Sequence, residues 1–131
     1  MEMTTTQRQT HTSTLLERYE KKLLAVLNSS LAWNYAKLPN NTFELQLAKY
    51  CEEIDEANEA ESDNYQHFIE ELADVIISIG GMMRFNEELA VEQLNGVLDC
   101  LDKYLLMDVV DYAEKKIPIL YERSYKDGYH H

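Results

Sequence analysis

The sequence predicts an all-α fold, a bundle of four to five helices. Apolar residues recur every three or four positions along most of the chain, and no segment alternates apolar and polar residues as a half-buried strand would. The chain has 131 residues, of which 45% are hydrophobic, so it can bury a core without disulfides or a structural metal. We expect residues 14–131 to form a single all-α domain. Residues 1–13 are polar and Thr-rich without periodicity, and we expect them to be a flexible N-terminal arm.

The first two helices are predicted from the residues that start and interrupt them. Thr14 and Glu17 have the spacing of a capping box, which satisfies backbone donors in a first helical turn. This helix should end at residues 28–30, where the run Asn-Ser-Ser interrupts the apolar pattern. Residues 31–41 hold the only Trp and one of the two prolines, and we expect a connection there. The second helix should cover residues 42–60.

Three further helices are predicted from the same apolar spacing, over residues 65–85, 87–106 and 108–123. Pro118 lies within the last of these, and we expect it to bend or end that helix because proline lacks a backbone donor. Two glycines at positions 80–81 lie within the third predicted helix, where each costs about 1 kcal/mol relative to alanine. Close packing against another helix, or a kink, would explain them.

Charge and composition argue against several classes of protein. The net charge of −12 opposes binding to nucleic acid, because surfaces that bind nucleic acid are basic. No apolar run approaches the roughly 18 residues of a membrane span, and no signal peptide precedes the domain, so we expect a cytoplasmic protein without membrane contact. Cys51 and Cys100 lie in apolar helical patterns without a C-x-x-C unit, which predicts buried, reduced core thiols.

The most unusual feature of the chain is its acidic segment. Between Tyr50 and Met83 there are ten carboxylates and no Lys or Arg. The pairs Glu53 with Glu56 and Glu71 with Asp74 each step three residues, which places both members of a pair on one helix face. Like charges so placed repel each other. A divalent cation among them would offset the repulsion, and oxygen ligands favour Mg²⁺ or Mn²⁺.

Helical-wheel positions place these four carboxylates at the borders of the apolar faces of the second and third helices. A short turn makes the two helices antiparallel neighbours, so packing their apolar faces together should bring the four side chains into one cleft. Glu52 and Glu70 would add a second layer. A solvated acidic face is the commonest alternative for a single such pair. A di-iron bundle is another, but it requires E-x-x-H repeats, which this chain lacks.

Two stretches of the chain carry a resemblance to a known family. Residues 46–56, QLAKYCEEIDE, and residues 70–75, EELADV, resemble the MazG-like all-α nucleoside triphosphate pyrophosphohydrolases, a superfamily that includes the dimeric dUTPases and the phosphoribosyl-ATP pyrophosphatases. The family signature is E-E-x-x-E, a variable spacer, then E-x-x-D. Here 14 residues separate Glu56 from Glu71, and the resemblance covers residues 43–85, about a third of the chain.

The resemblance implies a MazG-like bundle with a defined reaction. Glu53, Glu56, Glu71 and Asp74 would hold Mg²⁺, for which Mn²⁺ could substitute. Glu52 and Glu53 would be the catalytic residues, with Glu52 as an additional ligand or as the group that orients the attacking water. The reaction would cleave a (d)NTP between the α and β phosphates and release a (d)NMP and pyrophosphate.

Residues outside the signature are candidates for binding the substrate. Lys49 looks like a family residue, and Arg123 and Lys126 lie in a tail that loosely resembles one found in some relatives, so these three could contact phosphates. The alternative for Arg123 and Lys126 is that they complement a helix dipole. Trp33 and Asn34 precede the motif helix, where they could stack on and read a base. A Trp buried in the core or in an interface is the commoner outcome.

Lys115 and Lys116 are better explained as cations near a helix C-terminus than as substrate ligands. Members of the family generally form homodimers or dimers of dimers. The apolar content of the last two predicted helices fits such an interface, and it would serve the core of a monomer equally well. The competing interpretation of the whole chain is a non-catalytic acidic helical bundle of the same ancestry that acts as an interaction module. It predicts carboxylates spread over the surface rather than gathered in one cleft.

Overall fold

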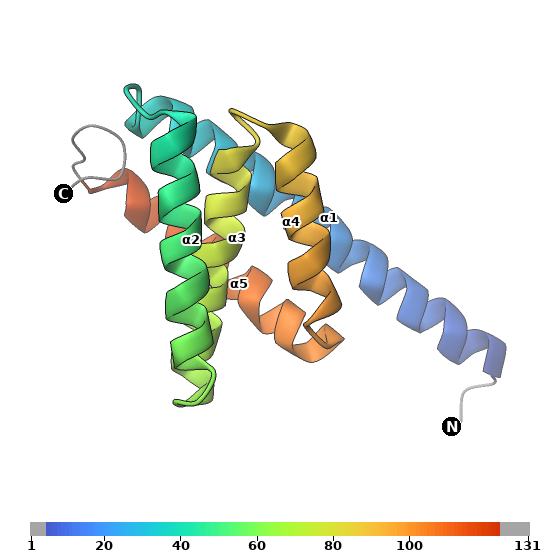
Figure 1. Ribbon diagram of the computed structural model, residues 1–131. Coiled ribbons are helices and arrows are strands. Elements are labelled where there is room, and N and C mark those ends of the chain that lie inside the picture. Colours follow the sequence, from blue (N-terminus) through green and yellow to red (C-terminus); the bar gives the residue numbers. More distant parts are fainter. Residues whose placement is uncertain (1–4, 124–131) are drawn as a thin grey trace.

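The computed structural model describes the backbone of residues 5–123 and the side chains of residues 18–123. Over this range it contains five α-helices and no strand, which confirms the predicted all-α bundle (Figure 1). The helices are α1 (Thr5–Lys37), α2 (Phe43–Ala60), α3 (Tyr65–Met82), α4 (Glu87–Asp99) and α5 (Lys103–Tyr121). Within the described range, no helix combines the length and the apolar character that crossing a membrane requires.

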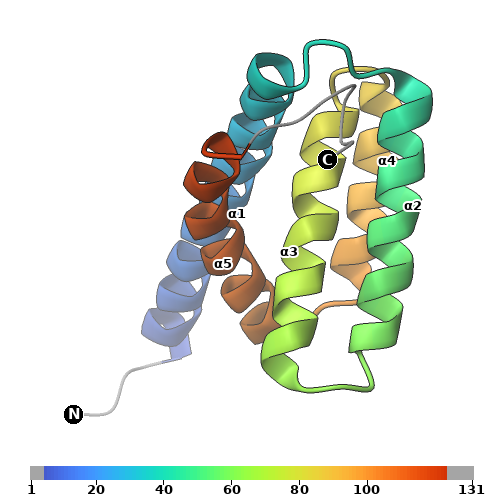
Figure 2. The ribbon, with the colours of Figure 1, turned by 90° about the vertical axis from the view of Figure 1, so that its left-hand side faces the viewer.

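Helix α3 is the centre of the bundle. It packs against α1, α2, α4 and α5, and Figure 2 shows it between α1 and α5 on one side and α2 and α4 on the other. Every residue of α3 from Val75 to Met82 is buried, as expected for a helix surrounded by others. All five helices contribute side chains to one hydrophobic cluster around it. The acidic pair of α3 therefore lies on the most tightly enclosed helix of the molecule.

Side-chain caps start four of the five helices. In each case the cap accepts a hydrogen bond from the backbone N–H three residues later, which satisfies a donor that has no partner within the helix. The predicted starts at residues 42, 65 and 87 are confirmed to within a residue, whereas the predicted boundary between the last two helices is wrong. Helix α4 ends at Asp99 rather than Leu106, because Asp102 caps a new helix. The four caps are Thr42, Asn64, Asn86 and Asp102.

Helix α1 is longer than predicted at both ends. It begins nine residues before the expected start at Thr14 and continues through most of the expected connection at residues 31–41. The buried Ser30 donates its hydroxyl to the carbonyl of Val26 at 2.8 Å, so it is satisfied within the helix instead of ending it. The helix stops just before Pro39, since proline disfavours the helical conformation of the preceding residue.

Parts of the two predicted termini lie outside the described residues. These are the first four residues of the arm predicted at 1–13, and residues 124–131, which include Lys126. Residues 5–13 of the predicted arm belong to α1. At the other end, α5 continues three residues beyond Pro118, so this proline does not end the helix.

The two glycines of α3 lie where this helix meets α1 and α2. A Cβ on Gly80 would fall 2.6 Å from Ser30 Cβ and 2.9 Å from the Leu27 carbonyl oxygen of α1. A Cβ on Gly81 would fall 2.5 Å from Asn34 Nδ2. Real Cβ atoms do not approach other atoms this closely, which confirms close helix packing as the reason for both glycines.

The cysteines correct another prediction. Both are free thiols, but Cys51 and Cys100 are exposed rather than buried. They line a groove of about 710 Å³ that also borders α3 and is lined by apolar side chains such as Ile54, Phe68 and Val97. Some apolar residues of α2 and α4 thus line this groove, and others lie in the core. Burial cannot be inferred from such a pattern alone when two helices of a bundle do not pack tightly on each other.

Candidate metal centre

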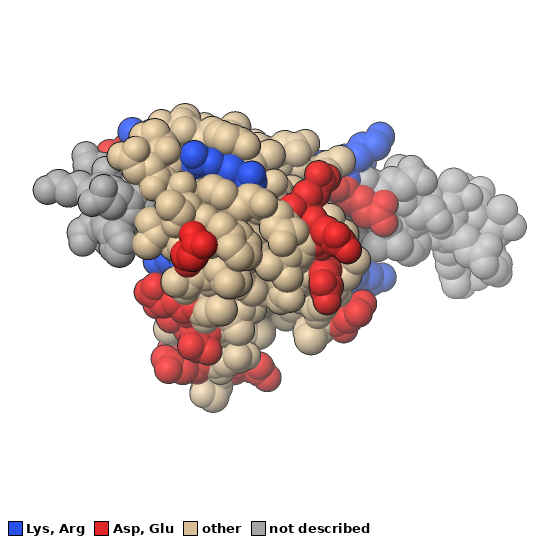
Figure 3. Space-filling view, turned by 45° about the horizontal axis from the view of Figure 1, so that its top comes forward, with Lys and Arg blue, Asp and Glu red and all other residues tan. Residues whose placement is uncertain are grey.

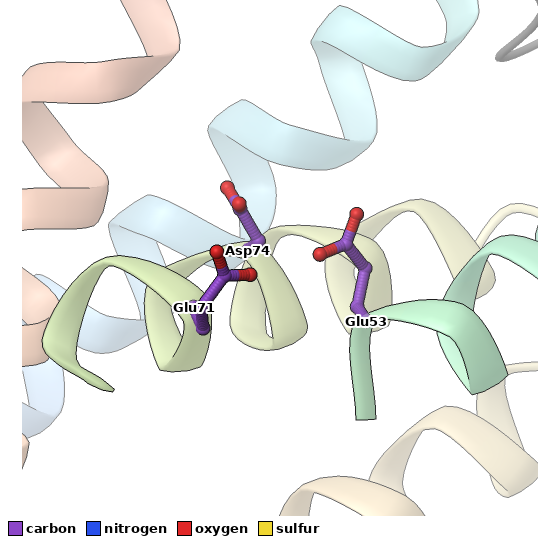
Figure 4. Close-up of side chains that lie close together, drawn as sticks. All are labelled: Glu53, Glu71 and Asp74. Atoms are coloured by element: carbon purple, nitrogen blue, oxygen red, sulfur yellow. The ribbon is translucent and has the colours of Figure 1, made fainter. Parts of the chain in front are cut away.

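Three of the four predicted carboxylate ligands converge between α2 and α3. One carboxylate oxygen from each of Glu53, Glu71 and Asp74 lies within 4.8 Å of the other two. Figure 4 shows Glu53 reaching in from α2, and Glu71 and Asp74 from successive turns of α3. The turn at residues 61–64 makes the two helices antiparallel neighbours, as predicted. We call Glu53, Glu56, Glu71 and Asp74 the carboxylate cluster.

Glu56 is the fourth member of the carboxylate cluster. It lies one turn after Glu53 on α2. Partial burial and the negative charges of Glu53 and Glu71 raise its pKa from the ordinary 4.5 to about 7. A carboxyl group whose pKa is raised by neighbouring carboxylates is typical of a site where like charges are held together.

Burial distinguishes the cluster from an ordinary acidic surface. Glu53 is only 5% exposed. Its Oε1 accepts a hydrogen bond from Lys49, but its Oε2 is buried without a hydrogen-bond partner among the described residues. Glu71 Oε2 is buried and unpartnered in the same way. Buried polar atoms are nearly always hydrogen-bonded, so two carboxylate oxygens without a partner among the described residues are groups that a cationic ligand would satisfy.

The pKa values of the cluster agree with this interpretation. Burial, together with the charge of Asp74, raises the pKa of Glu53 despite the opposing effect of Lys49. Burial likewise raises the pKa of Asp74, although the contact with Lys116 acts in the opposite direction. The protein thus holds these groups where their ionised forms are unfavourable without further positive charge. Binding a cation would reverse that preference.

Two lysines flank the cluster. Lys49 Nζ lies 3.0 Å from Glu53 Oε1 and 3.8 Å from Glu52 Oε1, one turn along α2. Lys116 Nζ contacts Asp74 Oδ1 from α5. The sequence analysis placed Lys49 at the site but assigned Lys116 to a helix end. The signal for Lys116 is its spacing of seven residues from the buried Val109, which places a lysine on the inner face of α5.

His67 is a second residue that the sequence analysis missed. Its Nε2 lies 3.2 Å from Glu71 Oε1, and its Nδ1 lies 2.7 Å from Asp63 Oδ2. The hydrogen bond to Asp63 is the main cause of a raised pKa for His67. Its position four residues before Glu71 and four after Asp63 was the available signal. His67 thus contacts one oxygen of Glu71, and the other oxygen is the one without a hydrogen-bond partner among the described residues.

Two predicted substrate residues lie elsewhere. Trp33 is 1% exposed and belongs to the core, which is the alternative that the sequence left open. Asn34 is buried and donates to Gln46 Oε1 at 3.0 Å, while its own side-chain oxygen accepts from Asn41 and Arg84. This network ties the end of α1 to α2 and α3. It meets α3 near Gly81, about two turns beyond Asp74, so neither residue is brought to the cluster.

The other predicted residues are more exposed. Glu52 lies on the solvent side of α2 and contacts the cluster only through Lys49. Glu70, of the predicted second layer, is half-buried and accepts a hydrogen bond from Tyr112 of α5 at 3.2 Å. Arg123 is exposed just beyond the end of α5. The substrate roles of Arg123 and Lys126, and the catalytic role of Glu52, stay predictions.

The donor set fits a hard divalent cation. It consists of carboxylate oxygens alone, which Mg²⁺ and Mn²⁺ prefer, whereas zinc and iron sites usually recruit imidazole or thiolate. On the face in Figure 3, Asp and Glu lie in several separate groups, so surface acidity by itself does not identify a site. The carboxylate cluster differs from those groups in the burial of Glu53 and in the unpartnered oxygens of Glu53 and Glu71 among the described residues.

Comparison with known proteins gives no relative. No family model, no curated protein and no solved structure matches the chain. Membership of the MazG-like family is therefore not shown by similarity. The chemistry of the carboxylate cluster is what bears on function.

Proposed function

We propose that this protein is a Mg²⁺-dependent nucleoside triphosphate pyrophosphohydrolase of the MazG-like type. It would cleave a (d)NTP between the α and β phosphates to a (d)NMP and pyrophosphate, with Mn²⁺ able to replace Mg²⁺. One observation carries the proposal. One carboxylate oxygen from each of Glu53 on α2 and Glu71 and Asp74 on the antiparallel α3 lies within 4.8 Å of the other two, and two buried oxygens of this group have no partner among the described residues.

The cluster residues have defined roles in this proposal. Glu53, Glu56, Glu71 and Asp74 hold the ion through their oxygens. A divalent ion bound there supplies charge neutralisation for the phosphates and acidifies a bound water. Lys49 and His67 keep Glu53 and Glu71 in place through hydrogen bonds of 3.0 and 3.2 Å, so these ligands are oriented before substrate arrives.

The remaining assignments concern the substrate. Glu52, on the open side of α2, would meet a water that enters from solvent, and it is the proposed orienting group. Lys49, Arg123 and Lys126 are the proposed phosphate contacts. A triphosphate is strongly anionic, and the chain carries a net charge of −12, so such contacts and the divalent ion together are needed to hold it.

We further propose that the active form is a homodimer or a dimer of dimers that works in the cytoplasm. Large apolar side chains exposed on α4 and α5 are available for such an interface: Val91, Tyr104, Ile119 and Tyr121. Light scattering during size-exclusion chromatography, at several protein concentrations, measures the mass of the particle and so its oligomeric state. A mass of one chain at every concentration would rule the dimer out.

Product analysis tests the proposed reaction. The protein is incubated with each NTP and dNTP in the presence of Mg²⁺, and pyrophosphate is distinguished from orthophosphate. We expect equal amounts of nucleoside monophosphate and pyrophosphate, and loss of both in Glu53→Gln and Asp74→Asn. Glu59→Gln is the matched control, because Glu59 is exposed on the same helix outside the cluster. Orthophosphate as the sole product would refute α–β cleavage, and no product from any nucleotide would favour the interaction module.

A further inference from the structure

The carboxylate cluster already contains two positive charges from the protein itself. Lys49 pairs with Glu53 within α2, whereas Lys116 reaches Asp74 from α5, a helix that carries no part of the acidic signature. The Lys116 and Asp74 side chains are 17% and 23% exposed, so this ion pair is partly sheltered from water. Lys116 is thus placed at the cluster by the tertiary fold alone.

The two ammonium groups balance only part of the negative charge of the cluster. Four carboxylates and two ammonium groups have a net charge of −2 when all six groups are ionised. One divalent cation would neutralise this charge. A divalent ion in the cluster would therefore favour release of one lysine ammonium from its carboxylate. A bound phosphate, which is an anion, would be stabilised by pairing with such an ammonium group.

Lys116 is better suited to leave than Lys49. Lys49 lies one turn from both Glu52 and Glu53 on its own helix, so it stays beside carboxylates whatever else binds. Within residues 18–123, Lys116 has a single carboxylate partner, Asp74 on another helix. A lysine ammonium is a point charge on a flexible four-carbon stem, and it can exchange one anionic oxygen for another by rotating that stem.

We propose that Lys116 is an exchangeable counter-cation of the carboxylate cluster, which pairs with Asp74 before a divalent ion binds and with a phosphate of the nucleotide afterwards. This inference rests on the proposed function. It gives Lys116 two measurable effects. The ammonium competes with a divalent ion for Asp74, and it contributes to holding phosphate once that ion is bound.

The first effect is tested by titrating the metal-free protein with Mn²⁺ in a calorimeter. In Lys116→Gln the competing ammonium is absent, and we expect Mn²⁺ to bind about fivefold more tightly than in wild type. Lys115→Gln removes the same charge from the exposed neighbouring residue, so it measures the effect of net charge alone and should change affinity less than twofold. Lys116→Arg keeps a cation and should resemble wild type. Mn²⁺ affinity in Lys116→Gln that equals that of Lys115→Gln, or is weaker, would overturn the proposal.

The second effect is tested by titrating the Mn²⁺-saturated protein with pyrophosphate. Lys116→Gln should bind pyrophosphate about fivefold more weakly than wild type and Lys115→Gln. Unchanged pyrophosphate binding would overturn the exchange even if the first titration succeeds. Circular dichroism first checks that each variant is folded. If Lys116→Gln is unfolded, Lys116→Met, which retains the unbranched stem, replaces it in both titrations.

The two hypotheses fail in different ways. If Mn²⁺ binds neither wild type nor Lys116→Gln, or binds Glu53→Gln as well as wild type, then the metal site of the proposed function is wrong and the exchange falls with it. If Glu53→Gln abolishes Mn²⁺ binding while Lys116→Gln leaves the affinity at the level of Lys115→Gln, only the role of Lys116 is wrong.

Discussion

Lys49 Nζ lies 3.0 Å from Glu53 Oε1 and leaves Glu53 Oε2 buried without a hydrogen-bond partner. The ion pair satisfies one oxygen of the most buried carboxylate among the described side chains. The nearest carboxylates, Glu71 and Asp74, are themselves acidic and cannot satisfy the other. This arrangement is unfavourable for a protein that only needs to fold, and it is useful for one that binds a cation, so it makes stability and function separable by mutation.

Glu53→Gln should stabilise the metal-free protein. The amide keeps the shape of the side chain and an oxygen that Lys49 can bond, while it removes a buried charge that repels Asp74. We expect the free energy of unfolding in EDTA to rise by roughly 1 kcal/mol. Urea unfolding followed by circular dichroism measures it. Glu59→Gln, on the exposed face of the same helix, should change it by less than about 0.5 kcal/mol. A marked loss of stability in Glu53→Gln would show that Lys49 already compensates the charge of the Glu53 carboxylate in the wild type.

The metal-free protein should lose stability as the pH rises from about 4.5 to about 7. The pKa of Glu56 is 4.5 ordinarily and about 7 in the folded protein, so the folded state holds this proton more tightly than the unfolded state does. The stabilisation is fully present below pH 4.5 and is lost as the pH rises through 7. Glu53, Asp74 and His67 also have raised pKa values and act in the same direction.

Thermal melts in EDTA at several pH values between these limits test this dependence. Glu56→Gln removes one of the groups and should flatten the profile. Saturating Mg²⁺ should flatten it in wild type, because the ion replaces the protons. A melting temperature that increases over the same interval would contradict the assigned directions.

Gly80→Ala should destabilise the protein at the contact between α3 and α1. The new methyl group would lie 2.6 Å from Ser30 Cβ and 2.9 Å from a backbone oxygen, so the helices must separate. We expect a loss of about 1–3 kcal/mol in urea unfolding. Gly96→Ala in α4 is the matched control, since nothing lies within 4 Å of its Cβ and alanine favours the helix. Equal effects of the two substitutions would contradict close packing at Gly80.

The elements that carry the carboxylate cluster were predictable because their signals are local. Thr42 and the turn at residues 61–64 fix where α2 and α3 begin and end, and helical spacing then fixes which faces meet. Convergence of Glu53, Glu71 and Asp74 follows from these alone. The low exposure of Glu53, 5%, could not be predicted in this way, because its helical-wheel position lies only at the edge of the apolar face.

What the sequence analysis missed depends on partners far along the chain. Lys116 meets Asp74 across 42 residues; its spacing from Val109 places it on the inner face of α5, but no local pattern identifies Asp74 as its partner. Asn34 resembled a binding residue because it is polar and adjacent to the motif, yet it joins three helices through Gln46 and Arg84. Ser30 resembled a helix end, although its hydroxyl is satisfied inside the helix. Polar residues are ambiguous in sequence until their hydrogen-bond partners are known.

Stabilisation by Mg²⁺ reports whether the carboxylate cluster binds a divalent ion. An ion that binds only the folded protein stabilises it by about 2.7 kcal/mol at 100 times its dissociation constant. Thermal melts of wild type, Glu53→Gln, Asp74→Asn and Glu59→Gln are compared in EDTA and in millimolar Mg²⁺. We expect a rise of several degrees in wild type and Glu59→Gln, and none in the two cluster variants. An unchanged melting temperature in wild type, or an equal rise in Glu53→Gln, would contradict a metal centre at the carboxylate cluster.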